Sequence, residues 1–337
     1  MGASTMETKK WYAAIDVHSC GQPLRIITGG LPELPGTTMR DKALFFQRHE
    51  DDARKLLMSE PRGHYAMTGA IVTAPVTPEA RFGLLFLNQQ GLASVSGHGI
   101  IAAVTAWTAT GQIAPSDAAA GILIDCPSGT VQVVAEVEGD EVQSVSFRNV
   151  PSYVHTERFP VTIQGREIRV DVAFSGEFFA VVDIGEFGAT SFEPHQLRDW
   201  AGMIRSEAES RLELQHPQLD WISGIHGVFF YQRDEPDRLS FRSACVFAGE
   251  QLDRSPGGAG VCAHLAVLSS RGRLEPGQQA VYQGISGVQV IGSIARDSLL
   301  AGNKTIIPQL TGTAHVLGFM NFVLDPDDPL PDGFVLN

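Results

Sequence analysis

Two glycine-rich stretches of this chain carry the residues best suited to chemistry, and they read as copies of each other. The sequence SGHGIIAAVTAWTATG spans 96–111, and GGAGVCAHLAVLSSRG spans 257–272, so that Gly97 matches Gly258. Each is a glycine turn followed by an apolar run with helical spacing and a glycine stop. The unpaired N–H groups at a helix start attract anions. Two such turns that face each other can hold one carboxylate from both sides; for either turn alone, a packing role is the alternative.

The lead residues of the two turns differ in a way that matters for proton transfer. Ser96 opens the first turn and Gly257 opens the second. Only one side of a bound ligand would therefore meet a hydroxyl, and we expect the opposite wall to be bare. An alcohol becomes a base only when a helix-start field or a neighbouring imidazole activates it. His98 is a candidate for that imidazole, with a structural hydrogen bond of its ring as the alternative. Asp253 can accept hydrogen bonds from a ligand ammonium group, or cap a turn.

Length favours two domains, and bulk composition is ordinary for a soluble globular enzyme. The chain has 337 residues, 43% of them hydrophobic, and a formal net charge of -13. That charge argues against nucleic acid and against an anionic membrane surface as partners. No apolar stretch approaches the length that spans a bilayer, and the start MGASTMETKK lacks the apolar region of a secretory signal. We therefore expect a cytoplasmic location.

Cysteine spacing predicts neither a metal site nor a redox site. The four cysteines, Cys20, Cys126, Cys245 and Cys262, form no CxxC pair. His18 lies close to Cys20 in the sequence, but no third ligand follows at a suitable spacing. Cys262 lies beyond the first turn of the second predicted helix, where we expect it to pack in the core.

The order of predicted elements suggests a duplication. Strands, a helix, strands and a second helix follow in turn, twice over. This order predicts an α/β (α+β) fold with two similar halves, each with one central helix. We expect the boundary near Pro127, with 1–127 and about 303–337 in the first half and 128–302 in the second. Helices are predicted over 41–58 and 195–214, and the last strand over 314–324.

Several blocks, in order along nearly the whole chain, resemble the proline racemase superfamily. IDVHSCGQPLRI resembles the pattern DxHTxGEPxR, and SEPRGHYAMTGAIVTAPV resembles the EPRGH block. GLASVSGHG stands where the family has a CGHG-type motif, LDRSPGGAG where it has DRSPCGTG, and TAHVLGFMNFVLDPDDPL resembles its closing segment. The resemblance implies a diaminopimelate-epimerase-like fold: two pseudo-symmetric halves around a cleft that holds the active site. It implies no cofactor, and it allows a homodimer.

The resemblance also implies roles for individual residues. In the racemases and epimerases two thiols flank the substrate α-carbon; Ser96 stands at the first thiol position and Gly257 at the second. The implied substrate-binding residues are Gly97, His98, Gly258 and Ala259, through backbone N–H groups to the carboxylate, and Asp253, to the ring nitrogen. The chain departs from the family at Gln22, where glutamate is usual, and at Ala259, where threonine is usual.

Three functions remain open at this stage. The branch that dehydrates trans-3-hydroxy-L-proline also lacks the second cysteine and needs one base, so Ser96 facing Gly257 favours this hydro-lyase reaction, with Δ1-pyrroline-2-carboxylate as product. The first alternative is a 4-hydroxyproline 2-epimerase or proline racemase in which water or another residue replaces the far acid. The second alternative is a binding protein for imino acids without catalytic activity.

Overall fold

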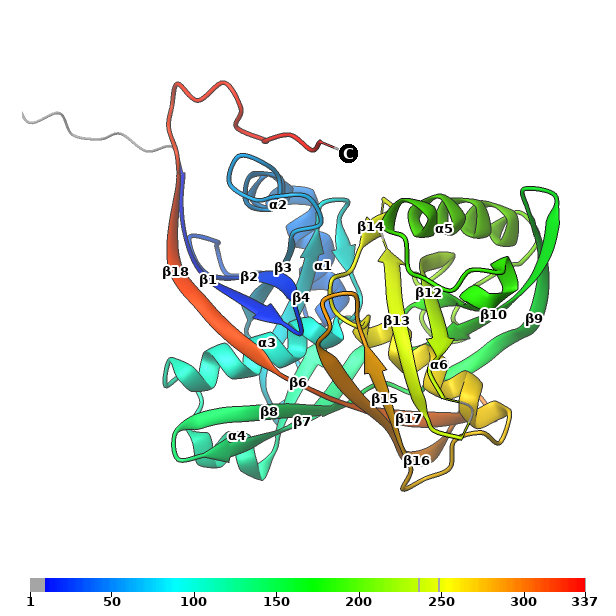
Figure 1. Cartoon of the computed structure of the whole chain (residues 1–337). Helices are drawn as coiled ribbons and strands as arrows, with labels where there is room; N and C mark the ends of the chain where they lie inside the picture. The colour runs from blue at the N-terminus through cyan, green and yellow to red at the C-terminus, as the bar shows by residue number, and fades with distance from the viewer. Residues whose placement is uncertain (1–9, 236, 248, 337) are drawn as a thin grey trace, which may run out of the picture.

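The computed structural model describes residues 10–235, 237–247 and 249–336 (Figure 1). Its helices are α1 (Met39–His49), α2 (Asp51–Met58), α3 (Gly97–Ala109), α4 (Pro115–Ala120), α5 (Pro194–Glu209) and α6 (Gly258–Ser270), with a short 3-10 helix at Ile184–Phe187. The strands before α6 are β1 (Lys10–Ser19), β2 (Gln22–Gly29), β3 (Thr68–Thr73), β4 (Ala80–Asn88), β5 (Leu92–Ala93), β6 (Ile122–Cys126), β7 (Gly129–Glu138), β8 (Glu141–Arg148), β9 (Tyr153–Ile163), β10 (Arg166–Phe174), β11 (Phe178–Asp183), β12 (Ile225–Arg233), β13 (Ser240–Phe247) and β14 (Gln251–Leu252). The strands after α6 are β15 (Gln279–Gln283), β16 (Gln289–Leu300), β17 (Asn303–Gly312) and β18 (Ala314–Leu324).

Strand pairing repeats almost element for element along the chain. The first run pairs in the order β18–β1–β2–β3–β4–β6–β7–β8. The second run pairs in the order β9–β10–β11–β12–β13–β15–β16–β17. In each run the third and fourth strands are parallel, as are the fifth and sixth. The predicted pair of similar α/β halves is therefore confirmed.

The two runs lie side by side, and the pairing of β8 with β17 joins them. In Figure 1 the first run is on the left and the second on the right, and β8 pairs with β17 between them. The last strand, β18, returns to β1 along its whole length, from Lys10↔Leu324 to Ser19↔Ala314. The division of the chain at 127/128 and near 303 stays a prediction.

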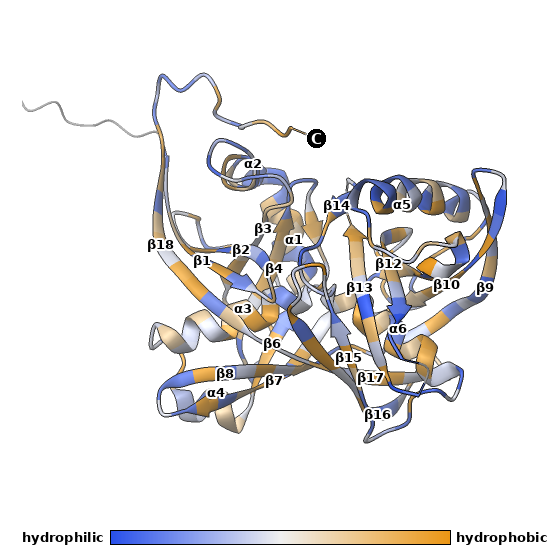
Figure 2. Ribbon diagram, viewed as in Figure 1, coloured by the Kyte–Doolittle hydropathy of each residue, from blue (hydrophilic) through white to orange (hydrophobic). Residues whose placement is uncertain are grey.

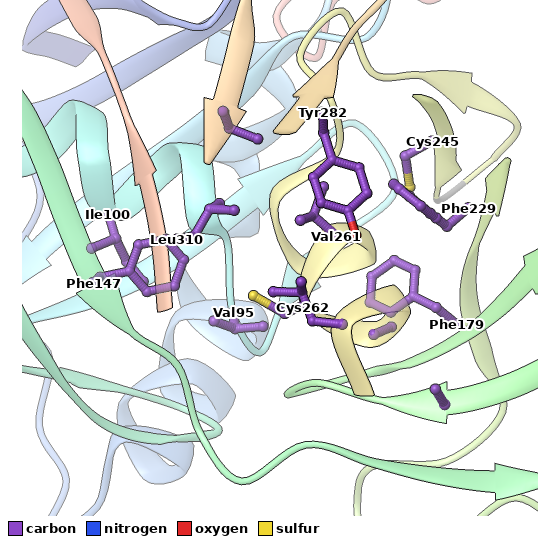
Figure 3. Packing of buried hydrophobic residues seen from close by; sticks show 14 of the residues in the cluster. Val95, Ile100, Phe147, Phe179, Phe229, Cys245, Val261, Cys262, Tyr282 and Leu310 are labelled. Atoms are coloured by element: carbon purple, nitrogen blue, oxygen red, sulfur yellow. The ribbon is translucent and has the colours of Figure 1, made fainter. Parts of the chain in front are cut away.

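A central helix is buried in each run. Ten residues of α3 and ten residues of α6 are buried. A helix that is apolar all round must be enclosed by other elements, and α3 packs on β1, β8 and β18 while α6 packs on β9, β10 and β17. Figure 3 shows part of this core, with Phe147 near α3 and Phe229 and Tyr282 around α6.

The surface helices follow the predicted amphipathic pattern with altered ends. α5 buries Leu197, Ala201, Ile204 and Ala208, one face of the helix, and Figure 2 shows polar and apolar residues alternating along it. The single helix predicted over 41–58 is wrong: Glu50, with φ -129° and ψ 10°, separates α1 from α2. Within the described ranges, no helix is both long and apolar enough to cross a membrane.

Candidate active site

A cavity lies where the N-terminal ends of α3 and α6 meet, between the two halves. Elements from both halves line it, including β4, β12 and β13. The structure brings every predicted site residue to this cavity: Ser96, Gly97, His98, Asp253, Gly257, Gly258 and Ala259. These residues are up to 163 positions apart in the sequence (96 to 259), so it is the duplication that brings them together.

The two helix starts touch through glycine backbone. A methyl group on Gly258 would lie 3.0 Å from the Gly97 Cα and 3.3 Å from the His98 nitrogen. A methyl group on Gly97 would lie 3.2 Å from the Gly258 Cα. No side chain therefore separates the first turns of α3 and α6. Backbone N–H groups and the positive ends of two helix dipoles are gathered at one place, which is the chemistry of an anion site.

Ser96 is the N-cap of α3. It has extended backbone, with φ -146° and ψ 110°, and its Oγ accepts the Gly99 N–H at 3.1 Å. A serine cap satisfies one of the free N–H groups at a helix start. The same N–H and the helix dipole also stabilise negative charge on Oγ. The capping contact is therefore compatible with a role of this hydroxyl in proton transfer.

The hydrogen-bond partners of His98 define its tautomer. Its Nε2 lies 3.4 Å from Thr68 Oγ1, and Thr68 gives its only hydroxyl proton to the Pro23 carbonyl at 2.7 Å. Nε2 must then be the donor in its contact with Thr68, which leaves Nδ1 as an acceptor. Burial lowers the pKa of His98, partly opposed by the Asp253 charge. A neutral imidazole therefore presents a lone pair toward Asp253.

Asp253 divides its two oxygens between the loop and the cavity. Oδ1 accepts the Ser255 N–H at 2.7 Å, and Oδ2 lies 3.8 Å from His98 Nδ1. The residue is only 3% exposed. The turn cap uses Oδ1 and leaves Oδ2 available, so the cap and a ligand-binding role, which were alternatives from the sequence, are compatible. Asp253 Oδ2 and His98 Nδ1 are two neighbouring acceptors, which suits an ammonium group with two N–H bonds.

The wall beside Gly257 is not bare, which corrects the expectation from the sequence. Gly257 has φ 93° and ψ 67°, a left-handed conformation that favours glycine. A methyl group on Gly257 would lie 2.7 Å from the Cβ of Cys245, and Cys245 lines the cavity. Burial raises the pKa of the Cys245 thiol well above its usual value, and the Asp253 charge adds to this. The only signal in the sequence was the alternation of β13, which points every second residue to one face.

His226 is a second cavity residue that the sequence did not single out. It comes from β12, and its ring lies 5.7 Å from that of Phe179 and 6.5 Å from that of Phe247 (centroid distances). Burial lowers the pKa of His226, with the Glu177 charge acting in the opposite direction. The cavity is thus lined by the two helix starts, by aromatic side chains and by one neutral imidazole.

Gln22 supports the site from outside. Its Nε2 donates to the Ala66 carbonyl at 2.9 Å, and its Oε1 accepts the Arg254 N–H at 2.9 Å. An amide side chain can donate and accept in this way, whereas an ionised carboxylate can only accept. The glutamine found where glutamate is usual therefore clamps the loop that carries Asp253.

The remaining residues discussed from the sequence lie away from this cavity. Cys20 donates to the Thr313 carbonyl at 3.5 Å, and the His18 ring packs on His315. Cys262 is buried in the main core, as expected. His264 lies further along α6, and its Nδ1 is 3.0 Å from the Tyr282 hydroxyl.

Comparison with known proteins identifies the family. The family model described as proline racemase matches residues 14–335. A trans-3-hydroxy-L-proline dehydratase of Bacillus thuringiensis subsp. konkukian (strain 97-27) is 39% identical, over 98% of this chain and 100% of that protein. A proline racemase of Acetoanaerobium sticklandii is 34% identical, again over 98% and 100%. A crystal structure of a hydroxyproline epimerase from Agrobacterium vitis, with bound trans-4-hydroxy-L-proline, has a TM-score of 0.91 at 30% identity, over 98% of this chain and 96% of that one. The chain therefore belongs to the proline racemase family.

Proposed function

We propose that this protein is a cofactor-independent hydro-lyase that converts trans-3-hydroxy-L-proline to Δ1-pyrroline-2-carboxylate, with Ser96 as the base. The observation that carries the proposal is the pair of lead residues: Ser96 presents a hydroxyl to the cavity, while Gly257 has no side chain. Elimination needs a base on one face only. The similarity to a protein named as this dehydratase, at 39% identity over the full length, supports the same reaction.

The two helix starts, Asp253 and His98 fit the charged groups of a proline derivative. The carboxylate would lie between the starts of α3 and α6, where Gly97 and Gly258 allow close approach to backbone N–H groups. The ring ammonium would donate one hydrogen bond to Asp253 Oδ2 and one to His98 Nδ1, which lie 3.8 Å apart. Both charges of the substrate are then held, so its C2–H bond has one defined direction.

Proton transfer starts from the Ser96 alkoxide. The hydroxyl first gives its own proton to solvent, and the Gly99 N–H at 3.1 Å and the start of α3 stabilise the resulting charge. The alkoxide takes the C2 proton. In trans-3-hydroxy-L-proline the hydroxyl is trans to the carboxylate, so it lies on the same ring face as that proton. The C3–O bond breaks as the hydroxyl takes the proton now on Ser96 Oγ, so water leaves and the alkoxide is regenerated. The enamine that remains becomes the imine when a proton is lost from nitrogen and one is added at C3.

A second candidate function is inversion at C2 by a 2-epimerase or racemase reaction. One observation favours it: Cys245 stands in the wall beside Gly257, where the sequence left no acid. Inversion and elimination share the first step, loss of the C2 proton. They differ in what happens to the carbanion.

Imine formation from trans-3-hydroxy-L-proline tests the proposal. The purified protein is incubated with this compound, and Δ1-pyrroline-2-carboxylate is trapped with an aromatic aldehyde reagent. We expect product with the natural protein and none with Ser96→Ala. Thr38→Ala is the matched control, because the Thr38 side chain also caps a helix, α1, but does not line the cavity. Absence of product above the Ser96→Ala background would reject the hydro-lyase reaction, and ligand-induced thermal stabilisation without turnover would indicate a binding protein.

A further inference from the structure

Cys245 occupies the place that a side chain at position 257 would take. The Cβ of Cys245 lies 2.7 Å from the point where a Gly257 Cβ would be, closer than two non-bonded carbon atoms can approach. A side chain at 257 and one at 245 therefore exclude each other in this backbone. The glycine is what lets the β13 side chain reach the cavity wall.

The strand that carries Cys245 faces the active-site loop along its length. Alternate residues of β13 point to one face, and Ser243, Cys245 and Phe247 share that face. Ser243 Oγ donates to the Pro256 carbonyl at 2.9 Å, and the Cys245 carbonyl accepts the Asp253 N–H at 2.8 Å. The thiol is thus held beside the loop from Asp253 to Gly257, and Figure 3 shows it next to Phe229, its strand partner.

Its place in the cavity lining sets Cys245 apart from the other described cysteines. The four cysteines are all buried, but Cys245 alone among them lines the cavity that Ser96 and Asp253 share. A thiol that is 3% exposed meets little solvent except through that cavity. Outside the protein interior, the thiol can therefore transfer its proton only to a ligand or solvent in the cavity.

We propose that Cys245 is the proton donor on the substrate face opposite Ser96, and that the protein inverts C2 of proline-type rings that carry no 3-hydroxyl. This inference rests on the proposed removal of the C2 proton by Ser96. A ring with a 3-hydroxyl can lose water after that step. A ring without one, such as trans-4-hydroxy-L-proline, holds its carbanion until a proton returns.

The proton balance of the inversion is simple. Ser96 Oγ takes the C2 proton from one face, and the electron pair stays on C2. The C2 lone pair then takes the proton of the Cys245 thiol from the other face, which leaves a thiolate on Cys245 and a protonated Ser96. Exchange of protons with solvent restores both groups, so the net change is inverted configuration at C2. No oxidant, reductant or co-reactant enters.

The surroundings of Cys245 suit an acid and not a base. Burial and the nearby Asp253 carboxylate both raise the pKa of the thiol, so it holds its proton at neutral pH. The thiolate that forms after donation is correspondingly reactive and recovers a proton readily. Ser96 has the opposite surroundings, since a helix start favours negative charge on its oxygen.

Protonation from the two faces of C2 can be distinguished by the ratio of inverted to retained product formed in D2O. The protein is incubated with trans-4-hydroxy-L-proline in D2O, and the C2-deuterated products are separated by configuration. Deuterated starting material reports protonation from the Ser96 face, and deuterated cis-4-hydroxy-D-proline reports protonation from the opposite face. The ratio of inverted to retained labelled product does not depend on how much of a preparation is active.

We expect both labelled products from the natural protein, and a fall in the ratio of at least 20-fold in Cys245→Ala. Cys245→Ser keeps the size of the side chain but is a weaker acid, so the ratio falls there too, which guards against loss of fold in the alanine variant. Cys262→Ala, a buried cysteine of α6 outside the cavity, leaves the ratio unchanged.

Three results would overturn the inference, and they are distinguishable from failure of the proposed function. Labelled product with retained configuration only, from the natural protein, would show a working Ser96 face and no acid opposite. An unchanged ratio in both Cys245 variants would assign the far proton to another group. Absence of deuterium from C2 in every product would overturn the inversion, while imine formation from trans-3-hydroxy-L-proline decides the proposed function separately.

Discussion

Gly97 and Gly258 meet backbone to backbone, since a methyl group on Gly258 would lie 3.0 Å from the Gly97 Cα. This contact joins the first turn of α3 to the first turn of α6, and so joins the two halves at the point where their helix dipoles converge. The proposed carboxylate site therefore depends on the absence of two Cβ atoms rather than on any charged side chain.

A methyl group at this contact should weaken binding of the substrate carboxylate. Gly258→Ala must push the two helix starts apart by a few tenths of an ångström, and overpacking of this kind costs roughly 1–3 kcal/mol. We expect KM for trans-3-hydroxy-L-proline to rise at least 10-fold. Gly91→Ala is the control, because a Cβ at Gly91 would meet no atom within 4 Å. An unchanged KM in Gly258→Ala would remove the carboxylate from the helix starts.

Asp253→Asn should reduce kcat/KM without unfolding the loop. Asparagine keeps an oxygen for the Ser255 N–H, which Oδ1 accepts at 2.7 Å, but it removes the charge from the oxygen that faces the cavity. A hydrogen bond to a charged group is worth about 1.5–3 kcal/mol, which corresponds to about 10- to 150-fold in kcat/KM. Asp183→Asn is the matched control, since Asp183 caps a turn at Gly185 outside the cavity. Equal kcat/KM in the two variants would contradict an ammonium site at Asp253.

Ser96→Cys should accelerate removal of the C2 proton. A thiol loses its proton far more readily than an alcohol, and it would occupy the same place at the start of α3. We expect imine formation to rise at least 10-fold at pH 8 and to become sensitive to iodoacetamide. Protection from iodoacetamide by substrate would place the new thiol in the site. A Ser96→Cys variant that forms no more imine than Ser96→Ala would contradict a role of this position as the base.

Acid should destabilise the protein through its buried histidines, above all His264. Burial lowers the pKa of His264 to about 3, with Arg271 and Arg273 adding to the effect. The unfolded chain binds this proton near pH 6.5, so between pH 6.5 and pH 3 the unfolded state holds more protons and acid favours it. The free energy of unfolding should fall by at most about 1.4 kcal/mol per pH unit from this group.

Denaturant unfolding at pH 6.0, 5.0 and 4.0 measures that slope. His264→Gln keeps a partner for the Tyr282 hydroxyl but cannot bind the proton, so the slope should become shallower by about one proton. His195→Gln, with a side chain that is 81% exposed, should leave the slope unchanged. Identical slopes in the natural protein and His264→Gln would show that other groups control acid unfolding.

Much of the site could be predicted from the sequence because the two turns are local. Ser96, Gly97 and Gly258 each belong to a run in which the glycines, the apolar helix and the stop are neighbours in sequence. The break between α1 and α2 at Glu50 could not be predicted. A helical pattern of apolar residues does not reveal that one residue leaves the helical conformation. The domain boundary near Pro127 stays a prediction.

Cys245 could not be predicted as a cavity residue for a different reason. Its place depends on the fold of the loop back along β13, where the Asp253 N–H meets the Cys245 carbonyl at 2.8 Å, and on the left-handed conformation of Gly257. Cys245 and Gly257 lie 12 positions apart in the sequence (245 to 257). The space beside Gly257 is occupied by the Cys245 side chain from β13, and a sequence motif does not show such a contact.

The central claim is that Ser96 removes the C2 proton of a ring held between two glycine turns. The most direct measurement is imine formation from trans-3-hydroxy-L-proline by the natural protein and by Ser96→Ala, with binding of the same compound to both followed by thermal shift. We predict imine from the natural protein, none from Ser96→Ala, and thermal stabilisation of both. Equal rates of imine formation in the two proteins would contradict it.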